Sequence, residues 1–532
     1  MSQVETLDIS RPGTAGSDAT KTIRVHADSI GSLHEVNEKQ TGDDFLKVQT
    51  AGDEEESAIP EDKKEEPLEN AEDDWIHDPR NPRNWPAGKK WTMTAIVSAY
   101  TFVTPLATSM MAPGLPEIAL KYGITSETII SMVLSIFLLT FAFGPLFLAP
   151  LSEIYGRTWI LHIGNLLFLV FNLICAYAPN TGVLLGMRLI CGFVGSAPIA
   201  CGGGTISDLF SERDRASAMA IYSLGPLIGP AVGPIAGGFI TETVGFKWVF
   251  IVISVLCGIV SIVGIPLLRE TYAPVIRLKI AKHSADPEKA AKAHPHLMQN
   301  HGSGLHLIWV NISRPFILLT RSFVCFVLSL YMAFMYGIYY LMFTTFPELF
   351  SVTYGFSPGI QGLCYIGLGF GFVLATIIGA SVADKVYHSL SIRNGGKGKP
   401  EFRVPALIFG SFFVPVGLFW YGWSAQAKIH WIMPIIGTGV FGFGMMTTYL
   451  PIQLYLVDTF TYAASALAAA SVFRSTLGFA FPLFGSQMYA ALGNGGGNSL
   501  LAGLAIVLGI PFPVWLWYKG EEVRQRSTLS RS

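Results

Sequence analysis

Two arginines and a histidine lie inside long apolar stretches of this 532-residue chain, where charged side chains are otherwise rare. They are Arg188, Arg474 and His162. An ionisable side chain at the centre of a membrane-inserted helix costs about 2.5 to 3.5 kcal/mol, so each is a candidate for a functional role. Structural roles stay open as well: Arg188 in a buried pair, Arg474 bonded to backbone carbonyls or to Asp458, and His162 packed on an apolar face.

Acidic side chains are missing from the middle of every apolar stretch and lie only near the ends. One set of ends carries Glu117, Glu242 and Glu348, and the other carries Asp208, Asp384 and Asp458. A group that carries protons must titrate, as Asp, Glu or His does when its surroundings shift its pKa. The candidates for such a carrier are therefore Asp208, Asp458 and His162.

A short polar segment, Ala149-Pro-Leu-Ser-Glu153-Ile-Tyr-Gly156-Arg157, joins two apolar stretches. Gly156 permits a tight turn. Glu153 and Arg157 are four residues apart, so they can bond to each other and to a neighbouring helix end.

A repeat of glycine followed by proline occupies residues 225–238. Its members are Gly225, Gly229, Gly233, Gly237, Pro226, Pro230 and Pro234, followed by Gly238. Because the glycines recur every fourth residue, one helix face lacks side chains and a partner helix can approach closely. The prolines are expected to bend the helix. The repeat fits a simple packing groove as well as a hinge or a seal.

Aromatic and amide side chains are candidates for the wall of a binding cavity. Tyr336, Tyr340 and Phe343 share one helix face. The polar candidates in other apolar stretches are Asn165, Gln361, Gln453 and Arg474. Apolar walls with a few polar groups suit lipophilic ligands, and the absence of deep acids disfavours polycations. Packing against lipid or neighbouring helices explains the aromatic residues equally well.

The elements that position these residues are predicted from composition and apolar length. Hydrophobic residues make up 51% of the chain and charged residues 14%, against roughly 25% charged in soluble domains. Twelve stretches reach the length of about 20 residues that a membrane span needs. They are 92–113, 127–149, 158–178, 183–207, 215–240, 247–268, 322–346, 359–383, 404–423, 431–456, 463–489 and 499–518. We therefore predict an all-α membrane protein with twelve transmembrane helices in two six-helix bundles.

Basic residues concentrate in alternate loops, which places those loops and both termini in the cytoplasm. The predicted parts are an acidic, disordered tail (1–74), a first bundle (75–268), a cytoplasmic linker (269–321), a second bundle (322–518) and a C-terminal tail (519–532). Five histidines lie in the linker, but their spacing matches no metal site, so we predict a solvated connection and no metal.

The motifs together resemble the major facilitator superfamily, and within it the fungal twelve-span drug:proton antiporters. The Glu153–Arg157 segment looks like the signature loop of that family, Arg188 with Gly192 and Gly195 looks like its intramembrane arginine motif, and 229–238 looks like its antiporter motif. The first signature departs from the family pattern at Ala149, Ile154 and Thr158, and its second-half counterpart, around Asp384, lacks the Gly-Arg ending.

The resemblance implies a major facilitator fold that exports lipophilic drugs, toxins or secondary metabolites by proton antiport and alternating access. It implies a role in proton coupling for Arg188, and the titratable candidates Asp208, His162 and Asp458 are assigned to the same process. The resemblance also implies a role in conformational gating for one set of residues: Glu153, Gly156, Arg157, Gly229, Gly233, Pro234, Gly237 and Gly238. A monomer in the plasma membrane is expected, with the vacuolar membrane as the alternative location.

Other functions stay open at this point. An uptake permease or uniporter would share the fold, and a transporter-like receptor could use the long tail for signalling. The sequence has no Gly-x-x-x-x-Gly-Lys-Ser/Thr phosphate-binding loop. We therefore expect neither an enzyme nor a cofactor, and no nucleic-acid partner.

Overall fold

The computed structural model describes residues 75, 77–211, 214–282, 304–460, 463–527 and 529–530. The predicted acidic tail and the histidines between 283 and 303 lie outside this range. Within it, eleven helical segments are long and apolar enough to cross a membrane. The last of them contains Gly493, whose backbone is not helical (φ 70°, ψ 169°) and which divides it into two spans. The described residues therefore contain the predicted twelve transmembrane helices.

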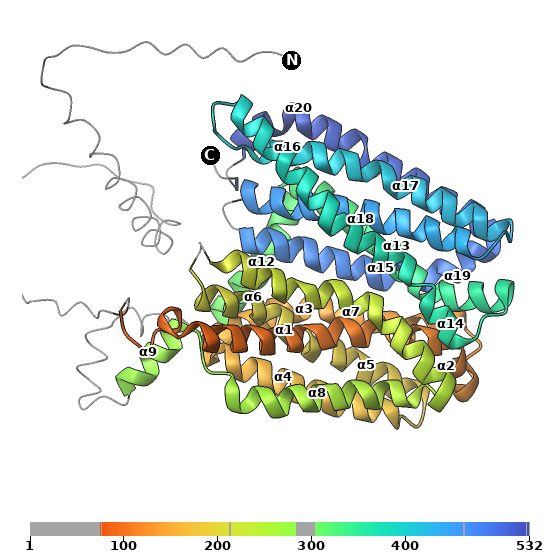
Figure 1. Ribbon diagram of the computed structural model, residues 1–532, viewed down its shortest axis with the longest axis horizontal. Coiled ribbons are helices and arrows are strands. Elements are labelled where there is room, and N and C mark those ends of the chain that lie inside the picture. Colours follow the sequence, from red (N-terminus) through yellow and green to blue (C-terminus); the bar gives the residue numbers. More distant parts are fainter. Residues whose placement is uncertain are drawn as a thin grey trace, which may run out of the picture. The chain divides into compact units, whose positions relative to one another are not determined.

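The first half is built from eight helices in chain order, drawn from red to yellow-green at the bottom of Figure 1. They are α1 (Ala87–Ser109), α2 (Leu115–Tyr122), α3 (Glu127–Tyr155), α4 (Arg157–Ala176), α5 (Thr181–Gly195), α6 (Ala197–Leu209), α7 (Arg215–Val244) and α8 (Lys247–Leu267). The first span is α1 with the 3-10 turn Ala112–Gly114 and α2, and the fourth is α5 with α6.

The second half occupies the top of Figure 1, in green to blue. Its helices are α13 (Phe323–Tyr354), α14 (Pro358–Leu363), α15 (Ile366–Leu374), α16 (Ala380–Arg393), α17 (Val404–Gln426), α18 (Ile432–Thr459), α19 (Ala463–Gly509) and α20 (Pro511–Gln525). A π-helical turn, Ala375–Gly379, links α15 to α16, and a 3-10 turn, Pro400–Arg403, precedes α17.

The connection between the halves contains two described helices, α9 (Ala273–Lys282) and α12 (Gly304–Arg321). α12 contacts α3, α13 and α19, and its Leu318 is buried. The prediction of a wholly solvated linker is therefore wrong for 304–321, because an apolar side of α12 finds partners in both halves.

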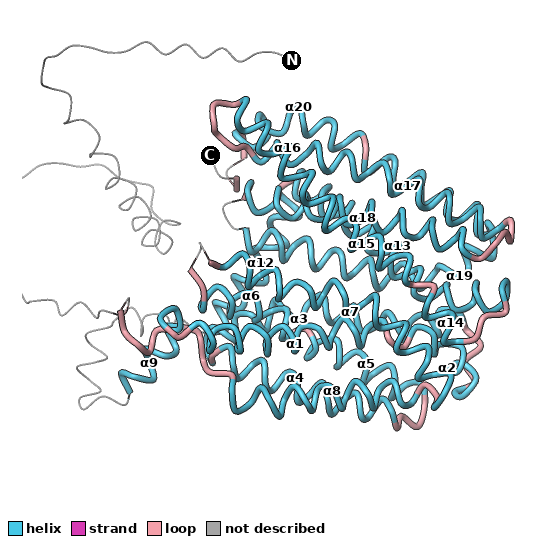
Figure 2. The backbone as a smooth tube through the Cα atoms, viewed as in Figure 1, coloured by secondary structure: helices cyan, strands magenta, loops and turns pink. Residues whose placement is uncertain are grey.

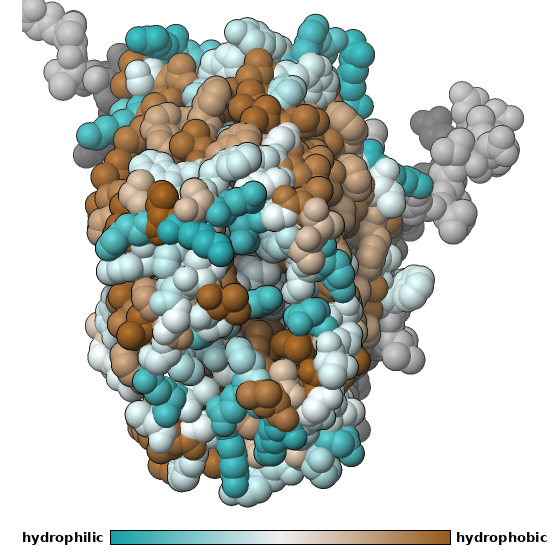
Figure 3. All heavy atoms as spheres, turned by 90° about the vertical axis from the view of Figure 1, so that its right-hand side faces the viewer, coloured by the Kyte–Doolittle hydropathy of each residue, from teal (hydrophilic) through white to brown (hydrophobic). Residues whose placement is uncertain are grey.

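Hydrophobic side chains cover the outer faces of several helices. α8 exposes Ile259, Ile262 and Val263, and α4 exposes Leu166 and Val170. Exposed apolar surface of this extent is stable against lipid rather than water. The loops gather at the two ends of the helices, as Figure 2 shows, and Figure 3 shows hydrophilic side chains spread over one of these ends.

We name the two ends by their residues. The arginine end carries Arg157 and Arg403, and the opposite end carries Glu117 and Glu242.

Candidate functional site

A cavity of about 360 Å³ lies between the two halves. The first half lines it with residues of α1, α3, α6 and α7, including Leu138, Phe141 and Ser223. The second half contributes α13, α15, the π-helical turn, α16, α18 and α19. A cavity whose walls come from both halves must change shape when the halves move against each other, which is what alternating access requires.

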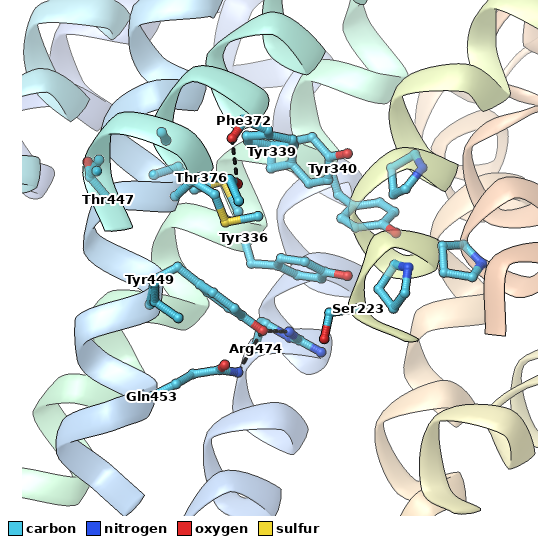
Figure 4. A pocket seen from close by; sticks show the side chains of 18 of the residues that line it. Ser223, Tyr336, Tyr339, Tyr340, Phe372, Thr376, Thr447, Tyr449, Gln453 and Arg474 are labelled. Atoms are coloured by element: carbon cyan, nitrogen blue, oxygen red, sulfur yellow. Dashed lines mark hydrogen bonds between the residues drawn. The ribbon is translucent and has the colours of Figure 1, made fainter. Parts of the chain in front are cut away.

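Three tyrosines of α13 form one wall, and two of them were predicted. Tyr336 and Tyr340 have ring centroids 5.0 Å apart, and Tyr339 meets Tyr340 edge to face at 5.4 Å. All three line the cavity, together with Phe372 of α15 (Figure 4). Aromatic rings in this number suit a ligand with a planar apolar body.

Arg474 projects from α19 into the cavity, as Figure 4 shows. Its Nη1 donates to the Tyr449 hydroxyl and its Nη2 to Ser471 Oγ, at 3.3 Å. Gln453 Nε2 donates to the same Tyr449 oxygen at 2.9 Å. The predicted cavity residues Arg474 and Gln453 therefore meet at Tyr449, which the sequence had not singled out.

Three other predicted cavity residues lie elsewhere. Phe343 stacks on Tyr365, with centroids 4.9 Å apart, and does not line the cavity. Asn165 donates to the Cys257 carbonyl and to Ser261 Oγ, which joins α4 to α8. Gln361 donates to the nearby Phe356 carbonyl. The amide groups of Asn165 and Gln361 therefore make contacts within one half.

The glycine repeat of α7 packs against α1. A Cβ at Gly229 would lie 3.0 Å from the Leu106 nitrogen, and one at Gly237 would lie 1.7 Å from the Met110 oxygen. A Cβ at Gly233 would likewise lie too close to Ser109 Oγ, and a Cβ at Gly238 would lie too close to the Pro358 carbonyl of the second half. The predicted close approach is present, and the partner is α1.

The prolines of the repeat face other surroundings. Pro226 and Pro230 line the cavity, while the Pro234 carbonyl lies 2.3 Å from the position of a Cβ on Gly362. α7 therefore presents Gly229, Gly233 and Gly237 to α1 and Pro226 and Pro230 to the cavity. It presents Gly238 and the Pro234 carbonyl to the second half.

Arg188 is fully buried in α5 and does not line the cavity. Its Nε donates to the Val133 carbonyl at 3.3 Å and its Nη2 to the Leu134 carbonyl at 3.4 Å. The guanidinium lies 4.9 Å from the Phe137 ring, and Nη1 has no hydrogen-bond partner among the described residues. No described carboxylate forms an ion pair with it, so its charge is held by helix carbonyls and a ring.

His162 lies between α4 and α1. Its Nδ1 is 3.0 Å from the Tyr100 hydroxyl, and its buried Nε2 has no hydrogen-bond partner in the described part of the chain. The ring does not reach the cavity.

Arg157 forms an ion pair with Asp208, not with Glu153. The Arg157 Nε to Asp208 Oδ2 distance is 2.7 Å, and Thr271 Oγ1 donates to the same oxygen at 3.3 Å. Gly156 has φ +103°, a conformation that glycine adopts without strain. The predicted pairing of Glu153 with Arg157 is therefore absent from the described contacts, whereas the predicted bond to a neighbouring helix end is present, because Arg157 reaches Asp208 at the end of α6.

Glu270, which the sequence had not indicated, caps the start of α4. Its carboxylate accepts from the backbone N–H groups of Arg157 (3.1 Å) and Thr158 (3.2 Å). An anion at a helix N-terminus is stabilised by the helix dipole. The Arg157 guanidinium also lies 5.0 Å from the ring of Tyr272, whose pKa is raised by burial and by the nearby Glu153 and Asp208 carboxylates.

Asp458 occupies the matching place in the second half. It pairs with Arg403, whose Nε lies 3.4 Å from Asp458 Oδ2, and Arg403 Nη1 lies 3.6 Å from Asp384 Oδ1. Arg403 supplies the guanidinium that the Asp384 segment lacks.

The hydrogen bonds that join the halves within the described ranges all lie at the opposite end. Glu242 Oε2 of α7 accepts from the Gly359 N–H at 2.9 Å and from Ser357 Oγ at 3.1 Å. Thr128 Oγ1 of α3 donates to the Leu483 carbonyl of α19 at 3.3 Å. This is the arrangement expected of a state closed at the opposite end.

A family model described as Major Facilitator Superfamily matches residues 97–482. The chain belongs to this superfamily. Among curated relatives, the efflux pump radE of Floropilus chiversii is 43% identical over 453 residues, 84% of this chain and 83% of that protein. The MFS transporter cpaT of Aspergillus oryzae is 43% identical over 85% of this chain and 90% of its own length. The efflux pump vrtL of Penicillium aethiopicum is 42% identical, with 85% and 89% covered.

Solved structures agree on the fold. The partially occluded inward-open xylose transporter XylE from E. coli matches with a TM-score of 0.60 at 13% identity, covering 81% of this chain and 98% of that one. This major facilitator chain is accordingly a transporter rather than an enzyme.

The sequence did not indicate several residues of this transporter's site. Ser223, Tyr339 and Tyr449 line the cavity, while Glu270 and Arg403 complete the ion-pair groups. Tyr339 could have been found from its neighbours on α13. The π-helical turn Ala375–Gly379, which also lines the cavity, has no sequence signal that we recognise, although such turns are frequent at functional sites.

Proposed function

We propose that this transporter exports lipophilic small molecules such as drugs, toxins or secondary metabolites. The observation that carries the proposal is the cavity between the halves, whose walls are mainly aromatic and aliphatic and whose described lining contains no Asp, Glu or His. Such walls bind lipophilic ligands. The names of radE and vrtL, both efflux pumps, support the outward direction.

We further propose proton antiport by alternating access. The glycine repeat of α7, packed on α1 and facing Gly359 and Gly362 of α14, is suited to a seal that opens when the halves rock. Because no described carboxylate or imidazole lines the cavity, the proton carrier in this proposal lies outside it, at Asp208, Asp458 or His162, with Arg188 as a coupling residue.

We assign the arginine end to the cytoplasm and the protein to the plasma membrane, as a monomer with both termini inside. Basic residues favour cytoplasmic loops, and the arginine end carries Arg157, Lys385, Arg393 and Arg403. In this orientation the structure is closed to the outside, so the cavity is loaded from the cytoplasm or the inner leaflet.

The test is expression in an efflux-deficient fungal cell, with accumulation of a panel of labelled lipophilic compounds followed with and without a proton uncoupler. We expect lower accumulation of some compounds, restored by the uncoupler. Accumulation that matches vector-only cells across the panel would contradict export. Efflux that ignores the uncoupler would contradict proton coupling alone. Tagged protein imaged in the same cells distinguishes the plasma membrane from the vacuole.

A further inference from the structure

Arg474 is a cation in an apolar cavity whose described lining offers it no counter-ion. We propose that Arg474 and Tyr449 bind an anionic group of the transported molecule, so that the substrates are amphipathic organic acids: carboxylic acids or acidic enols on an aromatic body. This inference rests on the proposed export function and narrows its substrate class.

The guanidinium has hydrogen-bonding capacity left over. An arginine offers five N–H donors. The described contacts use one on Nη1 and one on Nη2, and Nε is buried without an acceptor. Apart from the enclosed Nε, one N–H on each terminal nitrogen therefore has no acceptor among the described residues, and a carboxylate can accept these two side by side.

The hydroxyl of Tyr449 is a further hydrogen-bond donor for a bound anion. Its oxygen accepts from Arg474 and from Gln453, which uses both of its lone pairs. The hydroxyl hydrogen of Tyr449 must therefore point elsewhere, and no described acceptor takes it. An anion beside Arg474 would receive this third donor, and Ser223 of α7 stands across the cavity as a fourth (Figure 4).

Among the described residues, no carboxylate pairs with Arg474, and aromatic rings lie against its charge. Arg474 lies 4.7 Å from the Tyr336 ring and 5.6 Å from the Tyr449 ring. Cation–π contacts are weaker than an ion pair in a site shielded from water. A bound anion therefore stabilises the loaded cavity, whereas a cationic ligand would be repelled. The rest of the wall, including Leu138, Phe141 and Phe372, accommodates the apolar part of the acid.

Arg188 cannot take this role in the described state, because it is enclosed by α3 and α5 and does not line the cavity.

The test uses matched ligands on the full-length protein purified in detergent. The probes are aromatic carboxylates of increasing ring size, beginning with anthracene-9-carboxylate, each paired with its methyl ester, and binding is measured by titration calorimetry. We expect at least one acid to bind about tenfold tighter than its ester. Arg474→Gln should weaken acid binding about tenfold and leave ester binding within about twofold, because only the charge is lost. Tyr449→Phe should give a smaller, acid-selective loss.

The control is Lys385→Gln, which removes an exposed charge on α16 and should alter neither affinity. Equal affinity for acids and esters, no binding of any acid, or equal losses of both ligands in Arg474→Gln would overturn the proposal. Chloride or inorganic phosphate that displaces a bound acid at equal molar concentration would also overturn it, because the site would then serve inorganic anions.

Efflux assays with the same pairs separate this inference from the proposed function. Uncoupler-sensitive export of esters, with acids retained, would overturn the inference and leave export standing. Acids that bind through Arg474 but are never exported would contradict export and leave the binding site standing.

Discussion

Arg403 stands in the second half where Arg157 stands in the first. Arg157 begins α4 and pairs with Asp208, the penultimate residue of α6, while Arg403 caps α17 and pairs with Asp458, the penultimate residue of α18. Each guanidinium also faces a tyrosine ring, at 5.0 Å for Tyr272 and 3.9 Å for Tyr387. The two bundles thus repeat one ion-pair design at the arginine end, although the loop motif that announces it survives only in the first.

The two pairs differ in burial, which leads to the first prediction. Arg157→Gln should destabilise the protein by about 3–5 kcal/mol, because it leaves the carboxylate of Asp208 largely buried and unpaired. Arg403→Gln should cost roughly 1 kcal/mol or less, since Asp458 is 33% exposed and the pair is longer, at 3.4 Å.

Thermal unfolding of the purified variants measures both effects. Arg526→Gln removes an arginine that is 78% exposed in its pair with Glu522 and should leave the unfolding midpoint unchanged. An equal loss of stability in Arg157→Gln and Arg403→Gln would contradict the predicted difference between the two ion pairs.

The sequence predicted the helices well and the site only in part, for physical reasons. The length of an apolar stretch is enough to predict a membrane span. A glycine at every fourth residue predicts a helix face without side chains, whichever helix packs against it. Asn165 was misplaced because a polar residue in a span does not reveal which neighbour it meets, and here Ser261 of α8 satisfies it. Phe343 shares a face with Tyr336 but lies about 10 Å further along α13, beyond the cavity. Glu270 and Arg403 act across distances in the chain that no local pattern encodes.

The second prediction concerns the closed end. Glu242→Gln should shift the protein towards the state open at the opposite end, because a neutral amide accepts the Gly359 and Ser357 hydrogen bonds more weakly than a carboxylate. Accessibility of a cysteine placed at Thr128, in a background where the six buried native cysteines are replaced, reports this opening through its rate of maleimide labelling from that end. We expect the rate to rise several-fold.

Glu348→Gln is the matched control, because Glu348 lies on α13 and its side chain makes none of the described bonds between the halves. Labelling of Thr128→Cys that responds equally to both substitutions would show that general surface charge, not the Glu242 contact, holds this end closed.

The third prediction tests the close packing of α7 against α1. Gly237→Ala should abolish transport or expression, because the new Cβ would lie 1.7 Å from the Met110 carbonyl oxygen and the helices would have to separate. Gly203→Ala, where nothing lies within 4 Å of the new Cβ, should be tolerated. Efflux per molecule of surface-expressed protein is the measurement. Normal efflux in Gly237→Ala would mean that this close packing is not needed for the transport cycle.

The last prediction concerns Arg188. Arg188→Gln should leave folding and surface expression intact, because no described carboxylate is left unpaired and the Val133 and Leu134 carbonyls belong to a helix that already uses them. Uphill efflux should nevertheless fall at least tenfold if the residue couples proton movement to substrate export. Downhill counterflow of the same compound in proteoliposomes, which needs no proton gradient, should continue. Loss of expression would instead favour a structural role for Arg188, and loss of uphill efflux and counterflow together would favour a role in substrate binding.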